Sequence, residues 1–136
     1  MSVSIQDALV HLMVVTASSD SGISDRELAL IGNLVDRSPV FEGFDTINIA
    51  RVVNDCVDQI NGKSGLEGVI AQAVAALPLR LQDTAYALAV EVAVVDRQLP
   101  QEELRLLEMI RDHLEIDRLV TAAIETSARA RMRKRQ

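Results

Sequence analysis

Aromatic residues and cysteine are nearly absent from this chain. Its only rings are Phe41, Phe44 and Tyr86, and tryptophan is missing, although 49% of the residues are hydrophobic. A core of Ala, Val, Leu and Ile favours helices, because small side chains let helices approach closely. The single cysteine, Cys56, excludes an intramolecular disulfide and the common thiolate–metal patterns. Cys56 lies among apolar residues that recur with the period of a helix, which predicts a buried, unreactive thiol.

The chain also lacks a long hydrophobic run. The longest nearly apolar stretches, 8–17 and 85–95, are shorter than the roughly 20 residues needed to cross a bilayer. The N-terminal stretch has no basic region before its apolar run and contains Asp7, so we expect no signal peptide. These observations predict a cytoplasmic protein without a transmembrane segment.

Positive charge is scarce outside the C-terminal end. Residues 129–136 carry five Lys and Arg and no acid, which leaves 9 basic and 20 acidic residues elsewhere, a net charge of −11. An acidic body argues against a nucleic-acid partner, since phosphate contacts need clustered cations. We therefore divide the chain into a domain at 1–128 and a basic tail at 129–136. The tail could contact an anionic membrane surface or an acidic protein, but such a run of cations is more often a solvated terminus.

Helical periodicity and capping signals predict an all-α fold with no strand. Ser24 and Glu27 match a capping box at one helix start, and Ser64 and Glu67 match a second. No linker separates the elements, so we expect one domain of about seven helices. The expected ranges are 4–19, 24–38, 45–60, 64–78, 81–95, 100–114 and 116–130.

Two of these helices are apolar on nearly every side. A helix of that kind must be surrounded, whereas an amphipathic one lies at a surface. We therefore place 4–19 and 81–95 side by side at the centre, sheathed by the other five. Four positions should be almost inaccessible: Leu12, Val14, Leu88 and Val90.

The segments around these helices repeat. Residues 7–34 align without a gap on 83–110 and share eight identities. Asp20 aligns with Asp96, and Glu27 aligns with Glu103. The pattern indicates a duplicated helix–loop–helix, each copy a buried helix, an acidic turn and an amphipathic helix. Two such copies would pack about a pseudo-twofold axis.

The two turns carry the motifs A-x-x-D-x-x-I-S-x-x-E-L at 17–28 and A-x-x-D-x-x-L-P-x-E-E-L at 93–104. These resemble the signature turns of the TerB-like tellurite-resistance family. The resemblance implies an all-helical domain with two buried central helices. It also implies an accessory role in resistance to tellurite or other stress, with protein partners in that system.

The resemblance further implies a metal site at four acidic positions: Asp20 and Glu27 in the first turn, Asp96 and Glu103 in the second. Calcium or magnesium would suit such oxygen ligands. The second turn departs from the family pattern, because Arg97 and Gln98 follow its aspartate where the family places glycine. The alternative interpretation is structural, since the same acids can cap helices and complement the helix dipole.

Few residues point to catalysis. The histidines are His11, which we expect to be a hydrogen-bonded core residue, and His113 near a helix C-terminus. No nucleophile–histidine–acid spacing and no phosphate-binding glycine loop is present, so we predict no enzyme and no firm cofactor. The sequence favours a TerB-like accessory protein that acts by binding. The competing hypothesis is a helical protein-interaction module with no metal role.

Overall fold

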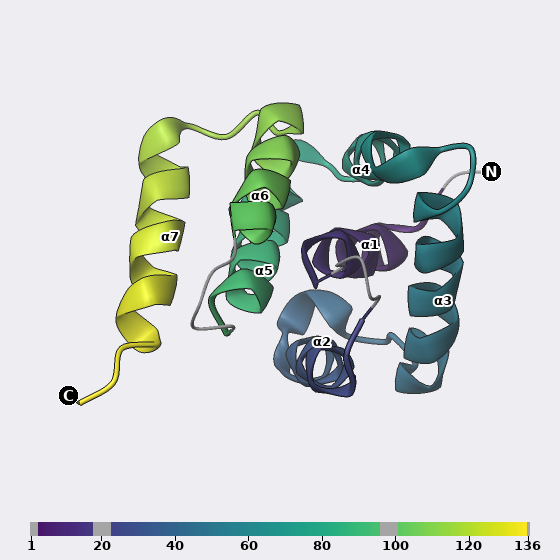
Figure 1. Cartoon of the computed structure of the whole chain (residues 1–136), viewed down its shortest axis with the longest axis horizontal. Helices are drawn as coiled ribbons and strands as arrows, with labels where there is room; N and C mark the ends of the chain where they lie inside the picture. Colours follow the sequence, from purple (N-terminus) through teal and green to yellow (C-terminus); the bar gives the residue numbers. More distant parts are fainter. Residues whose placement is uncertain (1–2, 18–22, 96–100, 136) are drawn as a thin grey trace.

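The structure, a computed structural model, describes residues 3–17, 23–95 and 101–135, and for residues 101–104 it describes the backbone alone. Across these residues it contains seven α-helices and no strand, which confirms the expected all-α fold (Figure 1). The helices are α1 (Ile5–Ala17), α2 (Asp25–Arg37), α3 (Ile49–Ile60), α4 (Gly65–Ala75), α5 (Gln82–Val95), α6 (Gln101–His113) and α7 (Arg118–Arg131). None of them is long and apolar enough to pass through a membrane.

Helices α1 and α5 pack against each other at the centre. α1 also contacts α2, α3, α4 and α6, while α5 also contacts α2, α6 and α7. The expected centre is confirmed at residue level. Leu12 and Val14 have no exposed surface, and Leu88 and Val90 are 7% and 1% exposed. The apolar composition on nearly all sides of α1 and α5 therefore predicted their central position correctly.

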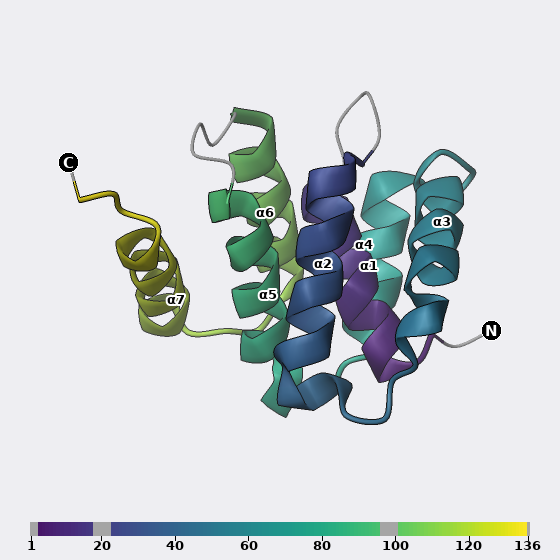
Figure 2. The same ribbon diagram turned by 90° about the horizontal axis from the view of Figure 1, so that it is seen from below.

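The first two helices and the pair α5–α6 have the same orientation. α1 and α5 run in broadly the same direction, and α2 and α6 return antiparallel to them (Figure 2). The C-terminal ends of α1 and α5 therefore lie at the same end of the bundle as the N-terminal ends of α2 and α6 (Figure 2). We call this the turn end.

One of the two expected capping boxes forms. Ser24 Oγ accepts a hydrogen bond from the Glu27 amide at 3.1 Å, and the Ser24 amide donates to Glu27 Oε1 at 3.1 Å. The prediction of a capping box at Ser64 is wrong, although α4 begins at the next residue. Ser64 has helical backbone angles and its side chain caps nothing, whereas Gly65 lies at φ 64°. A capping serine needs extended backbone to aim its oxygen at an amide.

The segment between α2 and α3 is built from two short 3-10 turns, Pro39–Phe41 (η1) and Thr46–Asn48 (η2). The helix expected from residue 45 therefore begins as η2, and α3 follows it at Ile49. Phe41 is buried and meets the ring of Phe44 edge-on at 5.7 Å, as expected for side chains packed against the core. Gln6 Nε2 fastens η1 to α1 by donating to the Val40 carbonyl at 3.3 Å.

Candidate functional site

Of the four expected metal ligands, the structure describes one side chain. Asp20 and Asp96 lie outside the described residues, and Glu103 falls in the first turn of α6, where only the backbone is described. Glu27 is engaged in its own helix start, where Oε1 accepts hydrogen bonds from the Ser24 amide and, at 2.9 Å, from the Ser24 hydroxyl. The first turns that contain Glu27 and Glu103 both lie at the turn end.

Elsewhere the acids are dispersed. Within residues 3–17, 23–95 and 105–135, no three His, Cys, Asp or Glu side chains gather closely enough to hold a metal ion. Hollows between the helices are the other candidates for a site, and three of them differ in chemical character.

A hollow with a largely polar lining lies between α1, α3 and α4, and we call it the His11 pocket. It has a volume of about 370 Å³. It was not foreseen from the sequence, because its walls come from segments some 60 residues apart. Its lining residues are Val3, Ser4, Asp7, His11, Arg51, Val52, Asp55, Gln59, Ser64 and Gln72.

His11 is the buried polar residue of this pocket, with 5% of its surface exposed. Its expected place in the core is confirmed, while no hydrogen-bond partner for its imidazole occurs among the described residues. Asp7 stands one helical turn earlier on the same face of α1. Burial lowers the pKa of His11, and the carboxylates of Asp7 and Asp55 act in the opposite direction. The neutral imidazole therefore predominates at pH 7.

Cys56 lies behind the His11 pocket in α3. Its Sγ contacts the backbone carbonyl of His11 at 3.8 Å, and burial raises the pKa of its thiol to about 12. A thiol with that pKa is protonated at neutral pH and is a poor nucleophile. The expected burial of Cys56 is confirmed.

A smaller hollow of about 170 Å³ lies where α5, α6 and α7 meet. There the Tyr86 hydroxyl donates to Glu125 Oε2 at 2.6 Å, and Arg111 donates to the same oxygen at 3.1 Å. Burial raises the pKa of Tyr86 above its ordinary range, and the hydrogen bond to Glu125 adds to the shift. Glu125 is thus held by two donors, and these polar contacts tie α7 to α5 and α6.

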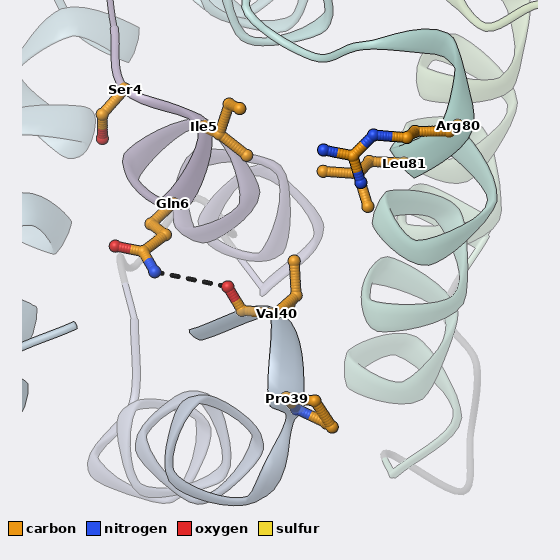
Figure 3. Close-up of a pocket in the computed structure, with 7 residues that line it drawn as sticks. All are labelled: Ser4, Ile5, Gln6, Pro39, Val40, Arg80 and Leu81. Carbon is orange, nitrogen blue, oxygen red and sulfur yellow. Dashed lines mark hydrogen bonds between the residues drawn. The ribbon is translucent and has the colours of Figure 1, made fainter. Parts of the chain in front are cut away.

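A third hollow, of about 650 Å³, has a mostly apolar lining (Figure 3). Ile5 from α1, Val40 from η1 and Leu81 from the 3-10 turn η3 (Leu79–Leu81) form its apolar walls. Arg80 extends from η3 toward α1, and Gln6 lies at the edge with its amide turned to Val40 (Figure 3). The described lining also includes the hydroxyl of Ser4, but no acid and no histidine that could activate it.

Comparison with protein-family models, with curated proteins and with solved structures finds no match to this chain.

Proposed function

We propose that the protein is a TerB-like accessory protein of a tellurite- or stress-resistance system, which acts by binding at the turn end. The observation that carries the proposal is the shared orientation of the pairs α1–α2 and α5–α6 around a buried α1–α5 contact. A duplicated unit with an acidic turn in each copy would, in this arrangement, present both turns on one face. Basic or cationic species suit such a face, because the body of the chain has a net charge of −11.

The proposed ligand is a divalent cation, calcium or magnesium. Asp20 and Glu27 supply carboxylate oxygens in the first turn, and Asp96 and Glu103 supply them in the second. Glu27 Oε1 is occupied by Ser24, so a cation would take Oε2. The second turn binds more weakly, since Arg97 places a positive charge beside Asp96.

The test is the cation dependence of the melting temperature. A cation bound only by the folded state raises this temperature by mass action. Glu27→Gln is the informative variant, because glutamine still completes a capping box but has no charge for the metal. Glu42→Gln, the same change in the exposed segment after η1, is the matched control. We expect the cation-dependent shift to disappear in Glu27→Gln and Asp20→Asn, and to survive in Glu42→Gln and largely in Asp96→Asn.

Absence of any shift at millimolar calcium or magnesium, with no saturable heat in calorimetry, would reject the metal role and leave capping as the function of Glu27. The stress role has a separate test. A host strain that lacks the gene should lose tolerance to tellurite or metals, and unchanged tolerance would contradict it.

A second candidate function, a protein-interaction module, is favoured by the outer face of α7. Leu119 is 80% exposed there, and the exposed cations Arg133, Lys134 and Arg135 follow the helix. The sharp test replaces these three cations with alanine, which leaves α7 and its ion pair between Arg131 and Glu91 intact. A partner captured by the unchanged protein should be lost by this variant. Retention of the partner would exclude the tail as the docking element.

A further inference from the structure

We propose that the His11 pocket is a binding site for an organic cation that carries N–H donors, namely a guanidinium or a primary ammonium group. The site lies between α1, α3 and α4 and shares no residue with the acidic turns. This proposal is therefore tested independently of the metal proposal. Its volume of about 370 Å³ is at the small end of the range for ligand pockets, roughly 300–1,000 Å³.

The first reason is the state of His11. Its side chain lines the pocket, is 95% withdrawn from solvent and has no hydrogen-bond partner in the described part of the chain. A neutral imidazole carries one nitrogen acceptor and one N–H donor, and leaving buried polar atoms unpaired is costly. A ligand with N–H donors would satisfy the acceptor nitrogen.

The second reason is charge. The charged groups of the pocket are Asp7 on α1 and Asp55 and Arg51 on α3, while α4 contributes Gln72 and no charge. With His11 neutral, two carboxylates face one guanidinium. The sum is negative, so the pocket repels an anion and attracts a cation.

The third reason is the availability of acceptors. Arg51 contacts Asp55 Oδ2 at 3.5 Å, and both side chains are more than half exposed. An exposed pair of this kind contributes little energy, so it opposes a competing ligand weakly. Asp55 Oδ1 and the carboxylate of Asp7, which line the same pocket as the imidazole, can then accept N–H bonds from a ligand. The planar fork of a guanidinium matches the two oxygens of a carboxylate better than a spherical ion does.

The experiment follows the imidazole resonances of both histidines by NMR while ethylguanidinium or ethylammonium is added. His113 is a built-in control, because its Nδ1 is already within 2.9 Å of the Met109 carbonyl on α6. We expect a saturable shift at His11 and none at His113. A parallel titration uses a tripeptide with a central arginine and blocked ends, which separates a free small cation from a partner's side chain as the source.

Two matched variants test the charge argument. Asp55→Asn should weaken binding about tenfold, as expected for loss of one charged acceptor. Asp58→Asn makes the same change on the same helix at an exposed position outside the pocket and should leave binding unchanged. Melting curves recorded before the titration serve to establish that both variants are folded.

Saturation with the simple cations supports a free small-molecule ligand, and saturation with the peptide alone supports a partner's basic side chain. The proposal is overturned if none of the three probes saturates at His11, or if His113 shifts in parallel. It is also overturned if Asp58→Asn weakens binding as much as Asp55→Asn, because general attraction to the acidic body would then explain the result. Preferential binding of acetate would contradict the charge argument directly.

Discussion

Replacing Tyr86 with phenylalanine should loosen α7 selectively. The substitution keeps a ring that is 1% exposed and removes only the hydroxyl that donates to Glu125. A hydrogen bond to a charged group contributes about 1.5–3 kcal/mol. Glu125 retains Arg111 and some contact with solvent, so we expect the unfolding free energy to fall by about 1–2 kcal/mol.

The reason for selectivity is the way α7 is attached. Only Thr121 and Ala128 of this helix are buried, and Leu119 at its start is 80% exposed. Apolar burial therefore stabilises α7 less than it stabilises α1 or α5. Native-state hydrogen exchange should accelerate about tenfold at the amides of α7, the equivalent of ~1.4 kcal/mol, and much less in α1.

Tyr86 also provides an optical assay, because it is the only tyrosine and the chain has no tryptophan. Its folded-state pKa is raised, so its contribution to stability is complete below about pH 10, the ordinary value, and is lost as the pH rises above that. The tyrosinate absorbance of the native protein should appear at higher pH than that of the urea-unfolded chain. Coincident titrations, or unchanged exchange in α7 of Tyr86→Phe, would refute the role assigned to this hydroxyl.

Three further predictions concern the core, the cap and the buried histidine. Leu88→Ala should lower the free energy of unfolding in urea by about 2–5 kcal/mol. Leu79→Ala, at a position 68% exposed, should change it by less than about 0.5 kcal/mol. Equal effects would mean that Leu88 does not lie at the centre. Ser24→Ala should cost about 0.5–2 kcal/mol through loss of its cap, and Ser64→Ala, which removes no cap, should cost less in the same assay. Because burial lowers the pKa of His11, the folded state disfavours its charged form, so stability should decline as the pH falls below the unfolded value of 6.5. His11→Gln should flatten that decline, and an unchanged pH profile would contradict the assignment.

The central packing could be predicted from the sequence because it depends on one local property. Residues 8–17 and 85–95 are apolar on nearly every side, and a helix of that composition must be surrounded by other helices. The start of α2 was predictable for a similar reason, since Ser24 and Glu27 complete their hydrogen bonds within four residues. The same spacing at Ser64 gave no cap, because the left-handed Gly65 that follows sets a different backbone path.

The pockets could not be predicted, since they depend on which helix faces align. Asp7 and His11 share a face of α1 by their spacing, but nothing in that spacing indicates that Asp55 faces them from α3. Tyr86 and Glu125 are 39 residues apart and meet only because α7 docks on α5. The metal role of the acidic turns stays a prediction, with Asp20 and Asp96 outside the described residues.

During synthesis, the burial of α1 must wait for most of the chain. α1 ends at Ala17 and its central neighbour α5 ends at Val95, so at about 5–20 residues per second the ribosome needs roughly 4–16 seconds to deliver the partner. Helices α2, α3 and α4 can cover part of α1 in that interval, but the stripe that packs on α5 and α6 stays exposed. Nascent chains arrested before residue 82 should therefore be captured by chaperones that bind apolar segments, and chains arrested well after α6 should escape them. The helix that organises the finished fold is therefore, on the ribosome, an exposed apolar segment that is prone to aggregation.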